Sequence, residues 1–162
     1  MHLRAATFAV LLVGYGCSDE CVKLPDVEPM IEIGTGWETF IPIGEVTGFE
    51  KGPQGGFHVY ASLRATGIFG GDSDDLRNTM PSLTYRVESL DGALTGGFSN
   101  MRRPMDQLDD GRAERLGDLA ILSSYEASEM EGVEVTISAE IKDTCGRRAI
   151  STARTILSEG AF

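Results

Sequence analysis

Residues 52–66 read GPQGGFHVYASLRAT, and this stretch decides the fold. Its first five residues favour a tight turn, because proline presets φ and glycine adopts positive φ at little cost. The next ten residues alternate between apolar and polar side chains, and a period of two predicts a half-buried β-strand. The apolar face consists of Phe57, Val59, Ala61, Leu63 and Ala65. The small alanines on that face predict the close approach of a second sheet.

The same alternation recurs further along the chain. Residues 82–89 (SLTYRVES) and 133–142 (VEVTISAEIK) each place apolar side chains at every second position. The pair Asp91-Gly92 predicts a hairpin that joins 82–89 to 93–99. Shorter β-prone runs occupy residues 30–33, 37–43, 45–49, 118–125 and 149–157. About eight short strands predict an all-β chain with two packed antiparallel sheets, a β-sandwich.

One segment breaks this rhythm. Residues 100–117 (NMRRPMDQLDDGRAERLG) are rich in charge, and one or two helical turns are expected after Pro104. The final five residues, 158–162, are expected to fray, as chain ends often do.

The last predicted hairpin, residues 141–157 (IKDTCGRRAISTARTIL), resembles the final strand pair of bacterial immunoglobulin-like domains. In that family a strand runs into an Asp-x-x-Gly turn, and the last strand leaves it. Together with GPQGGFHV (52–59), the chain resembles uncharacterised immunoglobulin-like lipoproteins of deltaproteobacteria. The resemblance implies an immunoglobulin-like antiparallel β-sandwich of about seven to eight strands, which we place at 29–158. It implies no function and no site residue.

Residues 1–17 (MHLRAATFAVLLVGYGC) predict export. A basic start, a short apolar run and a small-x-small site at 14–16 are typical of a secretory signal peptide over residues 1–16. The apolar run is too short to span a bilayer. Cys17 follows directly and resembles the cysteine of a bacterial lipobox, which implies lipidation; ordinary signal-peptidase cleavage after Gly16 is the alternative. Residues 17–28 then form an acidic tether.

The predicted location follows from these residues. Ser18 stands after the cysteine, and in the enterobacterial sorting pattern a residue other than Asp implies an outer-membrane lipoprotein. A soluble periplasmic or secreted protein is the alternative. The formal net charge of −11 repels phosphate backbones and anionic headgroups. We therefore expect no nucleic-acid partner, and membrane contact only through the lipid anchor.

The chain has three cysteines, and an odd number in an exported protein needs an explanation. If Cys17 carries lipid, Cys21 and Cys145 remain, and an oxidising compartment allows them to form a disulfide. The alternative is a tail thiol at Cys21 and a lone turn residue at Cys145.

His58 is the only histidine after the predicted signal peptide, and it follows the glycine-rich turn. We expect a binding rim formed by Gln54, His58, Tyr60, Arg102 and Arg103. One histidine cannot complete a usual zinc or copper site by itself. The loop methionines that could add soft copper ligands are Met80, Met101 and Met105.

The acidic loop around Asp72, Asp74 and Asp75 contains oxygen ligands of the kind that calcium prefers, but its spacing is not that of an EF-hand. A serine triad has little support, because there is no GxSxG motif. We therefore expect no cofactor and no enzymatic activity. The predicted function is a binding, adhesion or assembly role in the cell envelope, with an envelope protein or another surface ligand as partner. The alternatives are a calcium- or copper-binding envelope protein and a small secreted hydrolase.

Overall fold

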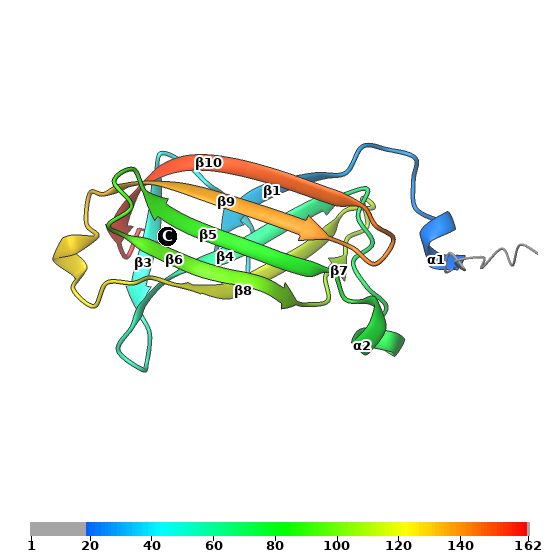
Figure 1. Ribbon diagram of the computed structural model, residues 1–162, viewed down its shortest axis with the longest axis horizontal. Helices are drawn as coiled ribbons and strands as arrows, with labels where there is room; N and C mark the ends of the chain where they lie inside the picture. Colours follow the sequence, from blue (N-terminus) through cyan, green and yellow to red (C-terminus); the bar gives the residue numbers. More distant parts are fainter. Residues whose placement is uncertain (1–18, 162) are drawn as a thin grey trace, which may run out of the picture.

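The computed structural model describes residues 19–161, and β-strands make up most of this range (Figure 1). The longer strands are β1 (Met30–Thr35), β3 (Val46–Lys51), β4 (Phe57–Thr66), β5 (Ser82–Ser89), β6 (Thr95–Arg102), β8 (Ala113–Ile121), β9 (Glu134–Lys142) and β10 (Arg148–Glu159). Two strands have two residues each: β2 (Ile41–Pro42) and β7 (Asp106–Gln107). The helical pieces are single turns: α1 (Asp19–Val22), a 3₁₀ turn at Ser73–Asp75, α2 (Leu76–Thr79) and a 3₁₀ turn at Ala127–Glu129.

The strands form two layers. In the first layer, β4 lies between β1 and β8, and both neighbours are antiparallel to it. The short strands β2 and β7 extend this layer beyond β1 and β8. In the second layer, β9 lies between β10 and β5, and β5 pairs with β6, all antiparallel.

Strand β3 joins the two layers. Its first four residues pair in parallel with the end of β10, and Glu50 and Lys51 then pair with β4. The orders β1-β4-β8-β7 and β10-β9-β5-β6 are those of an immunoglobulin-like sandwich. The predicted fold class is therefore confirmed, with one parallel pair added to an otherwise antiparallel arrangement.

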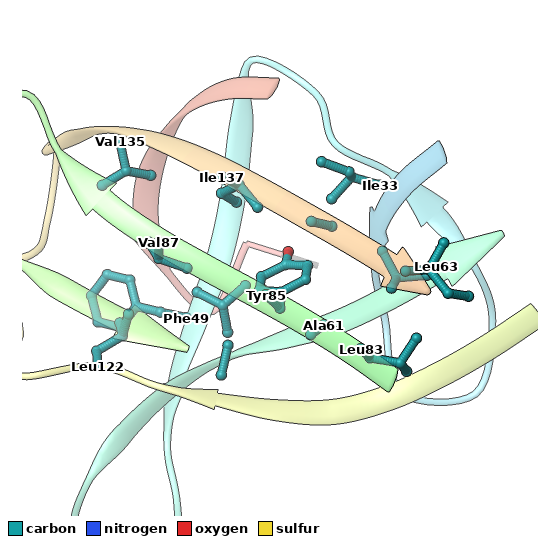
Figure 2. Close-up of a cluster of buried hydrophobic side chains, with 14 of the residues drawn as sticks. Ile33, Phe49, Ala61, Leu63, Leu83, Tyr85, Val87, Leu122, Val135 and Ile137 are labelled. Atoms are coloured by element: carbon teal, nitrogen blue, oxygen red, sulfur yellow. The ribbon is translucent and has the colours of Figure 1, made fainter. Parts of the chain in front are cut away.

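The core lies between the layers, where the predicted alternation places it. The apolar side chains of β4, β5 and β9 point inward and are almost fully buried (Figure 2). Leu83, Tyr85 and Val87 of β5 have at most 1% of their surface exposed. Burying these side chains favours folding because each removes apolar surface from water.

The predicted helical turns in 100–117 are wrong. Strand β6 continues to Arg102, β7 follows, and β8 begins at Ala113. The Met105 N–H donates to the Gly70 carbonyl oxygen at 2.9 Å, and the Met105 side chain is buried in the core. These long-range contacts hold the segment extended, so local charge composition does not decide its structure.

Other strand boundaries also differ from the sequence prediction, and two of these differences have a clear structural reason. Of the predicted run 37–43, only Ile41–Pro42 forms a strand, because a turn at Gly36 (φ +100°) precedes it. At the other end of the chain, β10 continues to Glu159. The Glu131 carboxylate accepts hydrogen bonds from Ser158 Oγ at 2.9 Å and from Glu159 N at 2.7 Å, which orders residues expected to fray.

The predicted Cys21–Cys145 disulfide is confirmed, with a Cα–Cα distance of 5.5 Å. It joins α1 to the turn between β9 and β10. Arg147 Nη1 also donates to the carbonyl oxygens of Pro25 and Gly67, each at 2.9 Å. The described part of the predicted tether is thus fastened to one end of the sandwich. The predicted signal peptide and Cys17 lie outside the described residues. Between residues 19 and 161, no helix is long and apolar enough to cross a membrane.

Candidate functional site

The structure separates the predicted binding residues into two groups. Gln54 lies in the turn between β3 and β4, where the Gly52 N–H donates to the Gly56 carbonyl oxygen at 2.7 Å. Gln54 and His58 line one pocket of about 490 Å³, and Tyr60 lies two residues further along β4. His58 and Tyr60 point to the same face of the first layer, and Gln54 lies in the turn before it; the roles of these residues in binding stay predictions.

Arg102 and Arg103 lie at the other end of the sandwich. Gly96, near the start of β6, forms an isolated β-bridge with Leu122. The Leu122 N–H in turn donates to the carbonyl oxygen of Phe57, so this end of β6 lies beside the start of β4. Arg102 is six residues further along β6, about 20 Å away at the usual strand rise. Arg102 therefore does not share a surface with Gln54 and His58, whereas the Arg103 side chain reaches Asp118, which pairs with Ala61 beside Tyr60.

Arg103 has a structural contact of its own. Its Nε lies 3.4 Å from Oδ1 of Asp118, and Arg115 donates to the same carboxylate at 2.8 and 3.0 Å. Asp118 is only 8% exposed, and a buried carboxylate needs such partners. The hydrogen bond from Arg115 to Asp118 raises the pKa of Arg115.

Glu50, His58 and Tyr60 form a polar cluster where β3 meets β4. The Tyr60 hydroxyl donates to Oε1 of Glu50, and this bond raises the pKa of Tyr60 to about 12. His58 Nε2 lies 3.3 Å from the same oxygen, without the alignment of a hydrogen bond. The His58 and Tyr60 rings meet edge to face at 5.0 Å. Tyr60 therefore remains a protonated donor at neutral pH.

His58 has the predicted outward direction, yet its side chain is only 3% exposed. The turn before β4 covers it: a Cβ added at Gly52 would lie 3.4 Å from His58 Nδ1. Glycine at this position lets the turn pack over the imidazole. The alternation on β4 thus gives the direction of His58 correctly but does not reveal its burial.

An exposed apolar surface surrounds this cluster, and we name it the aromatic face. It consists of the exposed side chains of Trp37, Leu119, Ile121 and Tyr125 and of the half-buried Tyr60. Trp37 is 59% exposed and Tyr125 75%. The Trp37 and Tyr60 ring centroids are 5.5 Å apart, and on β8 Leu119 pairs with Tyr60 and Ile121 with His58.

Hydrogen bonds to Ser62 hold Trp37 above the sheet. Ser62 Oγ donates to the Gly36 carbonyl oxygen at 2.8 Å and accepts from the Gly117 N–H at 3.1 Å. Gly117 has φ +67°, and a Cβ there would lie 3.0 Å from Cε3 of Trp37. The residue before Trp37 and the strand beneath it are thus fixed to the same buried hydroxyl.

Two hollows flank the Glu50–His58–Tyr60 cluster. The first, which we name the Trp37 pocket, has a volume of about 400 Å³ and contains Trp37, Glu38, Ile41, Glu50 and Tyr60 in its lining. The second is the pocket of about 490 Å³ that also contains Leu119, Ile121 and Tyr125. A further hollow of about 600 Å³ lies beside β6 and the end of β8, and it contains none of the predicted binding residues.

Sequence reasoning missed most of the aromatic face. Trp37 was expected within a strand, and Leu119, Ile121 and Tyr125 within another. One signal was present: residues 119–122 are all apolar, so a strand there must place apolar side chains on both faces. Only Tyr60 of this surface was among the predicted binding residues.

The candidate metal ligands do not meet in the structure. Asp72 Oδ1 accepts from the Asp74 N–H at 2.8 Å, and Asp75 Oδ1 accepts from Asn78 Nδ2 at 3.0 Å, so both carboxylates bond within their own loop. Met105 is buried in the core. Within residues 19–161, no three His, Cys, Asp or Glu side chains are grouped in a way that could hold a metal ion.

Comparison with known proteins gives little. No protein-family model matches the chain, and no curated protein matches it. Among solved structures, the chain is similar to the CooA pilin subunit from enterotoxigenic Escherichia coli, with a TM-score of 0.37 and 9% sequence identity. The match covers 79% of this chain and 98% of the pilin chain. A likeness this distant supports no inference about function.

Proposed function

We propose that this protein is an exported binding, adhesion or assembly protein of the bacterial cell envelope, without enzymatic activity, and that the aromatic face is its contact surface. The observation that carries this proposal is the gathering of large exposed apolar side chains on one face of the first layer. Contiguous exposed apolar surface is typical of interaction sites.

The outer sides of β8 and β9 differ in a way that supports the proposal. On β9, every second residue points to solvent and is polar: Glu134, Thr136, Ser138, Glu140 and Lys142. This is the usual pattern of an antiparallel sheet with one solvated face. On β8, Leu119 and Ile121 occupy the equivalent outward positions and are 40% and 50% exposed. Aromatic side chains such as Trp37 and Tyr125 are also enriched at protein interfaces.

The proposed location rests on two features. Residues 1–16 have the pattern of a signal peptide, and the Cys21–Cys145 disulfide is typical of an oxidising compartment. An acyl chain on Cys17 would lie four residues before Cys21, whose disulfide partner is at one end of the sandwich. The pocket beside Gln54 and His58 is at the opposite end of β4 from Gly67, which Arg147 contacts. Such an anchor would leave the aromatic face accessible.

The contact surface can be tested by crosslinking in the native envelope. The double variant Leu119→Ser, Ile121→Ser removes apolar surface from the aromatic face without touching the core. The matched control is Ile150→Ser, since Ile150 is 57% exposed on β10 in the other layer. We expect the double variant to lose the crosslinked partners while its urea unfolding curve is unchanged, and the control to keep them. Equal crosslinking by the wild type, the double variant and the control would overturn the proposal.

The anchor needs a separate measurement. The intact mass of protein purified from its own membrane should match a chain that starts at Cys17 and carries acyl groups. An unacylated mass would instead indicate a soluble periplasmic or secreted protein, and the search for partners would move to diffusible ligands.

A further inference from the structure

We propose that the Trp37 pocket receives an arginine side chain from a basic protein partner. This inference rests on the proposed function, because it names what the partner places on the aromatic face. The pocket lies between the β1–β2 turn, the end of β3 and the first half of β4.

The shape of the pocket suits a flat cation. The Trp37 and Tyr60 rings are inclined at 59° with centroids 5.5 Å apart, so they form two walls that meet at a corner. Ile41, 40% exposed, adds an apolar side chain to the lining. Aromatic ring faces attract cations, and a guanidinium also stacks on them as a planar group.

The charge of the pocket is complementary to such a group. Among residues 19–161, its lining includes the carboxylates of Glu38 and Glu50 and no lysine or arginine. The Glu50 side chain is 39% exposed, and the hydrogen bond from Tyr60 fixes one of its oxygens. A carboxylate beside aromatic rings offers a guanidinium both charge-assisted hydrogen bonds and a stacking surface.

The outer face of the first layer already contains a guanidinium, an aromatic ring and a carboxylate in contact, all from this chain. The Arg64 guanidinium lies 4.3 Å from the centre of the Phe40 ring, and its Nε donates to Glu114 at 2.5 Å. Arg64 and Tyr60 point to the same side of β4. Near Arg64 an arginine, a ring and a carboxylate are all supplied by this chain; the lining of the Trp37 pocket supplies the rings and the carboxylates only.

The site is also held in place before any partner arrives. Ser62 binds Gly36 and Gly117, between which Trp37 is positioned, and Glu50 is paired with His58 in the β3–β4 register. Little side-chain ordering is then needed on binding, and low ordering cost favours affinity.

The test uses the fluorescence of the full-length chain, because Trp37 is its only tryptophan. The probe is the capped tripeptide Gly-Arg-Gly, compared with the same peptide containing lysine or citrulline, an uncharged analogue of arginine. We expect saturable quenching by the arginine peptide, weaker binding of the lysine peptide, and about tenfold weaker binding of the citrulline peptide. Equal binding of the arginine and citrulline peptides would overturn the inference.

A pair of variants separates the pocket from general attraction to an acidic protein. Glu50→Gln removes one charge from the Trp37 pocket, and Glu88→Gln removes one from the exposed outer side of β5. We expect Glu50→Gln to weaken arginine-peptide binding about fivefold or more and Glu88→Gln to leave it unchanged. Equal losses in both variants would mean that the attraction is not specific to the pocket.

The arginine assignment and the proposed contact surface can be disproved separately. If the arginine peptide does not bind while Leu119→Ser, Ile121→Ser still abolishes crosslinking, the arginine assignment is wrong and the contact surface stands. If the peptide binds specifically while crosslinking is unaffected, the pocket chemistry stands and Leu119 and Ile121 are not part of the partner surface.

Discussion

The hydroxyl of Ser62 donates a hydrogen bond to the carbonyl oxygen of Gly36 at 2.8 Å, from a side chain with no solvent exposure. The same oxygen atom accepts the N–H of Gly117 at 3.1 Å. One buried serine on β4 thus joins the β1–β2 turn to β8, and Trp37 lies between these two attachments. The position of Trp37 in the Trp37 pocket depends on this contact.

Replacing Ser62 with alanine should therefore both destabilise the protein and loosen Trp37. Removal of the hydroxyl takes a partner from Gly36 and from Gly117 in a buried setting, with an expected loss of about 1–3 kcal/mol in the free energy of unfolding. Urea unfolding and acrylamide quenching of Trp37 measure the two effects. Ser128→Ala, at an exposed position, should change neither. Similar results for the two variants would contradict the structural role of Ser62.

The Asp118 ion pairs predict unequal effects for its two arginines. Arg115→Ala removes two close hydrogen bonds from the nearly buried Asp118 carboxylate, so we expect a loss of about 3–5 kcal/mol in the free energy of unfolding. Arg103→Ala should cost no more than about 1 kcal/mol, because the Arg103 side chain is 42% exposed and its contact is longer. Chemical denaturation of both variants measures this difference. Loss of crosslinked partners in Arg103→Ala would instead restore the binding role predicted for this residue.

The strands of the core could be predicted because their signal is local. On β4, β5 and β9, side chains alternate between the core and the outer face, so a period of two in the sequence gives both the strand and its buried face. The Cys21–Cys145 disulfide could be predicted by cysteine counting, because the predicted lipidation of Cys17 in an exported chain would leave one possible pair.

The aromatic face could not be predicted, because its residues come together only in three dimensions. Trp37 reaches Tyr60 through a turn whose shape depends on Gly36, Ser62 and Gly117. The segment 100–117 was misread for a related reason. Its charges suggested helical turns, while contacts such as Met105 to Gly70 hold it extended.

The disulfide should account for a large share of the stability. It closes a loop with a sequence separation of 124 residues, and the chain-entropy model assigns about 4–5 kcal/mol to a loop of that size. We expect Cys145→Ser to lose about this amount in urea unfolding. Wild-type protein treated with a reductant should match the untreated variant. If reduction leaves the wild type at full stability, the disulfide does not stabilise the fold.

Asp143 should tolerate neither alanine nor asparagine. It is 5% exposed, and its two oxygens accept from the N–H groups of Phe69 and Arg147 at 2.9 and 2.8 Å. Asparagine offers only one acceptor, so its amide NH₂ would face a second donor. We expect each variant to lose about 2–3 kcal/mol in thermal or urea unfolding. Full stability of Asp143→Asn would show that one of the two hydrogen bonds contributes nothing.

Tyr85 should be the residue whose replacement by phenylalanine stabilises the protein. Its hydroxyl is fully buried and has no hydrogen-bond partner within residues 19–161, and an unsatisfied buried hydroxyl is costly. We expect Tyr85→Phe to raise the free energy of unfolding by about 1 kcal/mol at neutral pH. Tyr125→Phe, at a 75% exposed position, should leave it unchanged.

The pH dependence of Tyr85→Phe supplies the decisive comparison. Burial raises the pKa of Tyr85 well above its usual range, so the folded protein keeps this proton when the unfolded chain loses it near pH 10. The unfolded state then binds fewer protons than the folded state, and stability falls as pH rises above about 10, by up to about 1.4 kcal/mol per pH unit for each such group. Tyr60, with its pKa raised to about 12 by the bond to Glu50, adds a second contribution that ends near pH 12.

Urea unfolding between pH 7 and pH 11 should therefore give a shallower alkaline decline in stability for Tyr85→Phe than for the wild type. Parallel curves would mean that the Tyr85 hydroxyl reaches solvent or a partner in the folded protein, and the expected gain at neutral pH would then also be absent.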